Sequence, residues 1–349
     1  MSKVLKGLAV LLIACIVVGC GGTSNDTRQT LRVFNWGEYV DYAVISAFEK
    51  EFNARVIYET FDSNEMMYTK FMGGNHYDIM VPSEYMIERM INEDLLQEID
   101  NDKIPNMSSI DELALHLPFD LENNYWIPYF YGNVGILYDT TMVDESDLED
   151  GWNILRNTKY SGQIYMYDSE RDSFMIALKA LGYSMNSTDE IEVEEAYQWL
   201  VDQKNEMNPV YVGDESIDTM KNSEKAMAVM YSGDATAVMS ENEDMAFFMP
   251  EEGTNIWFDG FVISKESEVV DLAHEFINFM IADDNALLHT QEVGYFTANK
   301  NAATIAAAKD YQGINAYGIR MDSSDEVFAY QDEKVKEMFN SRWIRVINQ

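Results

Sequence analysis

The sequence predicts an α/β fold of two packed lobes, in which mixed, mostly parallel sheets carry helices on both faces. Three observations lead to this prediction. A chain of 349 residues is longer than one small core requires. Hydrophobic residues make up 47% of it and aromatic residues 13%, which excludes a disordered protein. Strand and helix signals alternate, and no Pro- or Gly-rich linker marks a boundary, so we expect strands that cross between the lobes.

The first expected elements alternate between strand and helix. The segment 41–52 has apolar residues at helical spacing. Asp62 and Glu65 indicate the capped start of a second helix, which Gly73 ends. We expect strands over 31–36, 55–58 and 78–81, and helices over 41–52, 62–72 and from Ser83 onward. This order is typical of a parallel sheet, whose ligands lie beyond the carboxyl ends of its strands.

A second set of elements is expected after Gly132. Its expected strands cover 135–138, 163–167, 209–212, 226–231, 245–249 and 257–263, and its helices cover 170–181, 191–203 and a segment through His274 and Phe279. We expect the chain to cross between lobes near 132–133 and 257–260, because the sequence on either side builds separate sheets. Lobe 1 is therefore predicted to comprise 31–132 and 261–302, and lobe 2 to comprise 133–260 and 303–349.

The chain is strongly acidic. It has 61 Asp and Glu against 24 Lys and Arg, a net charge of -37 and a pI near 4.2. Such a surface repels phosphate backbones, which excludes nucleic acid as a partner, and it attracts small cations. The two cysteines, Cys15 and Cys20, provide no disulfide framework, and four scattered His give a zinc site no support.

The N-terminus has the layout of a secretory signal. Lys3 and Lys6 precede the mainly apolar run 7–18, which is too short to span a bilayer. A buried core helix is the alternative, but the basic flank and the lack of acids before Asp26 argue against it. The end of the run, Val-Val-Gly-Cys, resembles a bacterial lipobox. We predict a signal peptide over 1–19 and a lipid on Cys20, unless this cysteine is a chance small residue at the signal's end.

The predicted lipid and the residues that follow it indicate the cellular location of the protein. Segment 20–30 is expected to form a polar tether. No later segment has 18 consecutive apolar residues, so we expect the rest of the chain to be held outside the cytoplasmic membrane, in the periplasm or at the cell surface.

Five segments at expected strand ends combine aromatic and acidic residues. An ammonium can lie on aromatic faces, which is worth about 0.5–2 kcal/mol, and can be neutralised by carboxylates. Taken singly, each segment is better explained by core packing or helix capping. Taken together, they predict one shared site for a cation. The segments are 34–39, 82–85, 167–172, 231–234 and 257–259.

Other chemistries have no motif in this chain. It contains no GxGxxG, P-loop or Gly-x-Ser-x-Gly pattern, and its many acids allow no glycosidase pair to be singled out. We therefore expect no enzyme activity, no catalytic residue, no cofactor and no metal. Two alternatives stay open, which are a binding protein for another small cation or a metal and a secreted hydrolase that acts through carboxylates.

Several short blocks between Leu31 and Ile344 together resemble the bacterial spermidine/putrescine-binding proteins of ABC importers. The resemblance implies a two-lobed periplasmic-binding-protein fold that closes on a polyamine in the cleft between its lobes. It also implies docking to the permease subunits of an ABC transporter, and a monomer. The blocks are Phe-Asn-Trp-Gly-Glu-Tyr at 34–39, Ser-Asn-Glu-Met-Met-Tyr at 63–68, Tyr-Asp-Ile-Met-Val-Pro-Ser-Glu-Tyr at 77–85 and Gly-Tyr-x-Thr-x-Asn at 294–299.

The resemblance also implies which residues bind the ligand. Ser169 stands where the family usually has Asp, and Gly37 replaces a hydroxyl residue of some members, so putrescine is slightly favoured over a longer trication. Glu38, Glu84, Glu170 and Asp234 are acids that could compensate. The residues carried over are Trp36, Tyr39, Ser83, Tyr85, Ser169, Asp172, Tyr231, Trp257, Asp259, Tyr295 and Gln331.

Overall fold

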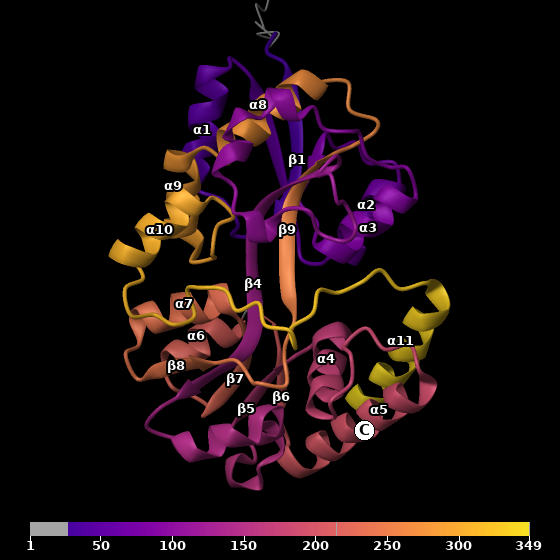
Figure 1. The fold of residues 1–349 in the computed structure, drawn as a ribbon, viewed down its shortest axis with the longest axis vertical. Helices are drawn as coiled ribbons and strands as arrows, with labels where there is room; N and C mark the ends of the chain where they lie inside the picture. The colour runs from indigo at the N-terminus through magenta and orange to yellow at the C-terminus, as the bar shows by residue number, and fades with distance from the viewer. Residues whose placement is uncertain (1–26, 214, 349) are drawn as a thin grey trace, which may run out of the picture.

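The computed structural model describes residues 27–213 and 215–348 and has two lobes of strands and helices (Figure 1). The upper lobe in Figure 1 contains β1, α1, α2, α3, α8 and α9, the lower one contains α4 to α7, and the long strands β4 and β9 run between them. This arrangement confirms the predicted α/β fold class. The predicted signal peptide and the lipidation site Cys20 lie outside the described residues, as does most of the tether.

One mixed sheet runs through both lobes. Its strand order is β2-β1-β3-β9-β4-β7-β5-β6, and β8 pairs with β4 beside this path. Pairs β1–β2, β1–β3, β5–β6 and β5–β7 are parallel, whereas the antiparallel pairs all involve β4 or β9. The strands are β1 (Thr30–Trp36), β2 (Arg55–Phe61), β3 (Ile79–Met80), β4 (Trp126–Asp139), β5 (Ile164–Tyr167), β6 (Val210–Val212), β7 (Met227–Tyr231), β8 (Met245–Phe248) and β9 (Ile256–Ile263).

Strand β4 belongs to both lobes. Its first part, Trp126–Asn133, pairs with β9, and its second part pairs with β7 and β8. The strand predicted over 135–138 is therefore too short. The residues of β4 from Trp126 to Leu137 are all buried, so the segment lacks the polar–apolar alternation that marks a strand with one exposed face.

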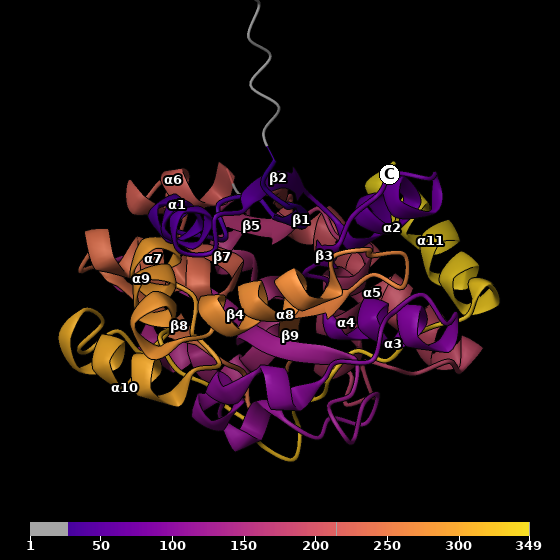
Figure 2. The same cartoon turned by 90° about the horizontal axis from the view of Figure 1, so that it is seen from above.

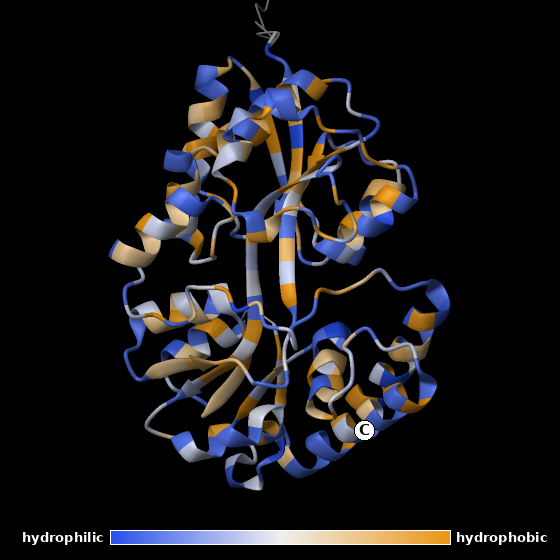
Figure 3. Cartoon of the chain, viewed as in Figure 1, coloured by the Kyte–Doolittle hydropathy of each residue, from blue (hydrophilic) through white to orange (hydrophobic). Residues whose placement is uncertain are grey.

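The helices cover both faces of the sheet. In Figure 3 hydrophobic and hydrophilic residues alternate along the outer helices, as they do in amphipathic helices. None of the helices within 27–213 and 215–348 is long and apolar enough to cross a membrane. They are α1 (Tyr42–Glu51), α2 (Asn64–Met72), α3 (Glu84–Asn92), α4 (Glu170–Ala180), α5 (Glu190–Met207), α6 (Glu215–Lys221), α7 (Ser232–Glu241), α8 (Val270–Met280), α9 (Asp283–Val293), α10 (Lys300–Lys309) and α11 (Glu333–Ile347).

Five of these helices, α6, α7, α9, α10 and α11, were not predicted. Helix α7 begins with Ser-Gly-Asp, which is typical of a turn. Helix α10 is rich in alanine, so no wide apolar stripe marks it. Short 3-10 helices complete the structure at Asn101–Lys103, Pro105–Ser109, Glu112–Ala114 and Thr158–Tyr160, and two more on either side of a kink at Gly151 within Glu145–Arg156.

The connection between α10 and α11 is a further crossing. The two helices lie at opposite sides of the molecule in both views (Figures 1 and 2), and the connection runs past β4. Asn133 on β4 exchanges two hydrogen bonds with the backbone of Arg320, at 2.9 and 3.0 Å. The crossing is thereby fixed to β4 at the point where this strand leaves β9.

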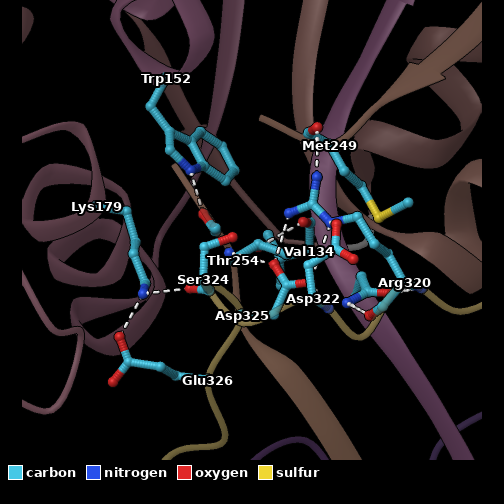
Figure 4. A network of polar contacts seen from close by, with 12 residues as sticks. Val134, Trp152, Lys179, Met249, Thr254, Arg320, Asp322, Ser324, Asp325 and Glu326 are labelled. Atoms are coloured by element: carbon cyan, nitrogen blue, oxygen red, sulfur yellow. Dashed lines mark hydrogen bonds and ion pairs between the residues drawn. The ribbon is translucent and has the colours of Figure 1, made fainter. Parts of the chain in front are cut away.

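A polar network anchors the same connection in lobe 2 (Figure 4). The guanidinium of Arg320 donates two hydrogen bonds to Asp325, at 3.0 and 2.6 Å. Asp325 also accepts the backbone N–H of Thr254 at 3.0 Å, and Lys179 forms an ion pair with Glu326. Because these groups hold the connection at several points, it is a fixed part of the fold.

Candidate functional site

The direction of β9 brings the first site residues together. Strands β1 and β3 are parallel and end at the same edge of the sheet. Because β9 is antiparallel to β3, the beginning of β9 lies at that edge too. Segment 257–259 therefore reaches the site from the amino-terminal end of β9, whereas the other four segments lie at the carboxyl ends of their strands.

Asp259 is a buried acid at this edge. It is 5% exposed, and it accepts hydrogen bonds from the Tyr39 hydroxyl at 2.7 Å and the Ser83 hydroxyl at 2.6 Å. Burial raises the pKa of Asp259 to about 6, although both hydroxyls oppose the rise. A cation beside this carboxylate would replace the water that burial has removed.

Asn64 on α2 connects Ser83 with Tyr85. Its amide nitrogen donates to the Ser83 hydroxyl at 3.0 Å and to the Tyr85 hydroxyl at 3.1 Å. The Tyr85 ring in turn carries a cation from the other lobe, since the Arg171 guanidinium lies 3.7 Å from its centroid. The Tyr85 face is thus already a cation-binding surface.

The second aspartate of the site lies at the start of α4. Asp172 accepts the Tyr231 hydroxyl at 2.9 Å, and its backbone N–H donates to the Ser169 hydroxyl at 3.3 Å. Burial raises the pKa of Asp172, and the hydroxyls of Ser169 and Tyr231 oppose the rise. The Tyr231 ring stacks on Tyr167 with centroids 4.8 Å apart.

A third carboxylate, Asp234, is absent from the predicted set of ligand-binding residues. It is buried and accepts hydrogen bonds from the hydroxyls of Tyr295 at 2.6 Å and Tyr167 at 3.3 Å. Tyr167 is likewise absent from that set. Both belong to segments that combine aromatic and acidic residues, 167–172 and 231–234, so the sequence signal was present. The segments alone could not show which acid points toward the other rings.

Ring contacts join these carboxylates into one cluster. Tyr295 contacts Tyr39 at 5.3 Å and Trp257 at 5.4 Å between centroids. Trp257 contacts Tyr231 at 6.1 Å. Each of the three aspartates therefore accepts a hydrogen bond from a tyrosine of a single aromatic cluster, which draws residues from both lobes.

Two glycines make room for the rings. A Cβ at Gly132 would lie 2.5 Å from the Trp257 ring, and one at Gly233 would lie 2.3 Å from the Tyr295 ring. Both distances are far below van der Waals contact. The backbone of β4 and of α7 thus forms part of the wall that holds Trp257 and Tyr295 in place.

Trp36 and Gln331 lie outside the ring cluster. Trp36 packs on Phe61 with centroids 4.6 Å apart, and its indole N–H has no hydrogen-bond partner among the described residues. Gln331 lines a small cavity together with Arg171 and Glu170. Burial raises the pKa of Glu170 to about 7, and the charge of Arg171 opposes the rise.

The arrangement suits a cation with an apolar body. Buried carboxylates neutralise ammonium groups, and aromatic faces attract cations and pack against methylenes. Within residues 27–213 and 215–348 no group of three or more His, Cys, Asp or Glu side chains is arranged to hold a metal ion.

Comparisons with known proteins cover most of the chain. The family of bacterial extracellular solute-binding proteins matches residues 43–316. The spermidine/putrescine-binding periplasmic protein of Escherichia coli K12 is 32% identical over 294 residues, which are 83% of each chain.

Solved structures resemble the whole fold. The spermidine/putrescine ABC transporter substrate-binding protein PotD of Streptococcus pneumoniae has a TM-score of 0.80 and 36% identity, over 92% of this chain and 99% of its own. The TpPotD lipoprotein of Treponema pallidum has a TM-score of 0.78 and 26% identity, over 91% of this chain and 99% of its own.

Proposed function

This chain belongs to the family of bacterial extracellular solute-binding proteins, and we propose that it captures a polyamine, putrescine or spermidine, for delivery to the permease of an ABC transporter. The ligand class comes from its relatives in Escherichia coli and Streptococcus pneumoniae, whose names state spermidine and putrescine. The site of this chain supports the same class on chemical grounds.

The observation that carries the proposal is the set of three buried aspartates on one aromatic cluster. Asp172, Asp234 and Asp259 each accept a tyrosine hydroxyl, and the rings between them are in contact. A polyamine is a methylene chain with ammonium groups at its ends. It would place its ammonium groups beside the carboxylates and pack its methylenes against the rings.

We assign the two terminal ammonium groups to Asp259 and Asp172, because one lies on the strand that joins the lobes and the other on a helix of lobe 2. Ser169 caps α4 with its hydroxyl. As a serine, it provides no carboxylate for a third ammonium. This favours putrescine over spermidine. The remaining proposed contacts are Trp36, Tyr39, Ser83, Tyr85, Ser169, Tyr231, Trp257, Tyr295 and Gln331, to which the structure adds Tyr167 and Asp234.

Calorimetry of the purified chain with putrescine, spermidine and spermine tests the proposal. We expect micromolar binding or tighter, which corresponds to about -8 kcal/mol, with putrescine bound at least as tightly as spermidine. Butylamine is the matched control, since it keeps the methylene chain but has one ammonium, and it should bind far more weakly. A folded protein that gives no heat with any polyamine would refute the proposed ligand class.

Binding without catalysis is the whole chemistry that we propose. The lobes, predicted as 31–132 with 261–302 and 133–260 with 303–349, would close on the ligand, exclude water and strengthen the charge contacts. The boundary at 302/303 falls inside α10 (Lys300–Lys309), which packs on α9, so we place this crossing after α10. X-ray scattering should show a smaller radius of gyration with putrescine than without it. An unchanged radius at saturating putrescine would argue against lobe closure.

We further propose that the protein acts outside the cytoplasmic membrane, held there by lipid on Cys20. The apolar run and the cysteine at its end support this, and a structural relative is named a lipoprotein. Cys20→Ser should release the protein in soluble form or leave the precursor uncleaved. Cys15→Ser, inside the apolar run, is the matched control and should fractionate with membranes like the wild type. Membrane association of processed Cys20→Ser would contradict the anchor.

A further inference from the structure

Glu84 is a buried acid that has no role in the site as described so far. It is the first residue of α3 and is 1% exposed. Its Oε2 atom accepts the backbone N–H of Phe258 at 2.9 Å. Phe258 lies between Trp257 and Asp259, so the Glu84 carboxyl holds the part of β9 that presents both side chains to the ligand.

The sheet needs an acceptor at this position. Segment 82–84 runs beside β9, where Gly260 N–H donates to the Pro82 carbonyl at 3.3 Å and Ser83 forms a bridge with Asp259. The chain then turns into α3 and moves away from β9. The Glu84 side chain takes the next hydrogen bond of the ladder, which would otherwise leave a buried N–H unpaired.

The charged and titratable groups around Glu84 come from three elements. Asp259 faces it from β9, Arg171 from α4, and Tyr85 is its neighbour on α3. Burial, with a smaller contribution from the charge of Asp259, raises the pKa of Glu84 to about 8, and the Phe258 N–H and Arg171 oppose the rise. These shifts favour a proton on Glu84 and the negative charge on Asp259 at neutral pH.

We propose that Glu84 is a positioning residue that couples polyamine capture to the release of a proton. The inference rests on the proposed function, because it needs an ammonium at Asp259. That ammonium brings one positive charge beside Asp259, which offsets the Asp259 charge and thereby favours ionised Glu84. The proton on the Glu84 carboxyl then leaves to solvent. The resulting carboxylate attracts the ammonium at Asp259 and accepts the Phe258 N–H more strongly.

The sign of the pH dependence follows from this order of events. Ammonium groups of pKa about 10 stay charged up to pH 8.5, so the ligand contributes little change. As pH rises from 7 to 8.5, a smaller fraction of the unliganded protein carries the Glu84 proton, so less proton release has to accompany binding. A pKa drop of about one unit on binding corresponds to tenfold in affinity. We therefore expect wild-type affinity to rise severalfold over this range.

Glu84→Gln separates the proton from the hydrogen bond. The amide oxygen can still accept the Phe258 N–H, so the variant mimics protonated Glu84. Its putrescine affinity should match the wild type at pH 7 and fall severalfold behind it at pH 8.5. Glu88→Gln, one turn later on α3, is the matched control. Glu88 accepts the Tyr330 N–H at 2.7 Å, and its substitution should leave the shape of the pH profile unchanged.

Calorimetry in two buffers of different ionisation enthalpy counts the protons directly. At pH 7.5 we expect the wild type and Glu88→Gln to release a measurable fraction of a proton on binding putrescine, and Glu84→Gln to release clearly less. Infrared difference spectra of the wild type give a second test that needs no variant. Putrescine should remove the absorbance of a protonated carboxylic acid.

The outcomes distinguish this inference from the proposed function. If the wild type binds no polyamine at any pH, the proposed ligand class fails. If it binds but Glu84→Gln keeps the wild-type pH profile and proton release, Glu84 only completes the sheet and the inference is wrong. If Glu84→Gln does not fold, the infrared spectrum decides, because an unchanged carboxylic acid band on binding overturns the inference.

Discussion

The two aspartates proposed for the ends of the ligand have partners of the same residue types, but these partners come from different distances along the chain. Asp259 is held by Ser83 and Tyr39, and Asp172 by Ser169 and Tyr231. Both serines are the N-caps of helices, Ser83 of α3 and Ser169 of α4. The chemistry of one serine, one tyrosine and one buried aspartate thus occurs once at each end.

The difference lies in the distance along the chain. Ser169 caps its own helix by accepting the Asp172 N–H, three residues away. Ser83 makes no side-chain cap bond and donates instead to Asp259, 176 residues away, while Tyr39 is 220 residues from it. The Asp172 end is therefore assembled largely by one helix start, and the Asp259 end only by the folded sheet.

Substitution of the two aspartates gives the largest expected effect. Asp259→Asn should weaken putrescine binding by about 2–5 kcal/mol, at least tenfold, because it leaves a buried ammonium without its partner. Asp172→Asn should cost less, since Asp234 and Glu170 remain as acids in lobe 2. Calorimetry measures both.

The control for these variants is Asp218→Asn, which removes a charge from a side chain that is 91% exposed. It should leave the affinity unchanged. The unliganded melting temperature of Asp259→Asn should hardly move. Unchanged affinity in Asp259→Asn, or a larger loss in Asp172→Asn, would contradict the assignment of the main charge contact to Asp259.

The glycine behind Trp257 gives the next effect. Gly132→Ala places a methyl group 2.5 Å from the Trp257 ring, and such overpacking costs about 1–3 kcal/mol of stability. We expect a lower melting temperature and weaker putrescine binding. Gly37→Ala is the matched control, since nothing lies within 4 Å of a Cβ there. Equal melting temperatures for the two variants would show that Trp257 is free to move aside.

Acid should weaken the Asp259 end. Burial raises the pKa of Asp259 to about 6, and ammonium binding requires the ionised form. Between pH 7 and pH 5 this carboxyl becomes protonated, so putrescine affinity should fall about tenfold. Asp259→Asn should remove most of this fall, whereas Asp172→Asn should retain it. A flat wild-type profile from pH 7 to pH 5 would contradict an ionised Asp259 in the complex.

The two serines give the smallest and most specific effect. Ser169→Ala removes a helix cap and should cost about 0.5–2 kcal/mol of stability. Ser83→Ala removes no cap bond, so it should lower putrescine affinity severalfold with little change in melting temperature. Thermal melts and calorimetry of both variants separate these effects. A cap-like loss of stability in Ser83→Ala would mean that the two ends are built alike.

Local sequence patterns were enough to predict most elements and the chemistry of the site. Apolar spacing and turn residues located the alternating strands and helices of lobe 1, because these signals are local. Aromatic and acidic residues in segments 34–39, 82–85, 167–172, 231–234 and 257–259 indicated a cation site, because each segment is short and contiguous. The start of α4, with Ser169 before Asp172, could also be read locally.

Which side chains meet depends on long-range pairing in the folded sheet. The antiparallel placement of β9 brings Asp259 to Tyr39 and Ser83, and no local pattern encodes a pairing over 176 or 220 residues. The unbroken length of β4 depends on burial from both faces, which erases the alternation that would have marked it. The burial of Glu84 also depends on a long-range contact, because its partner Phe258 becomes a neighbour only when the sheet has formed.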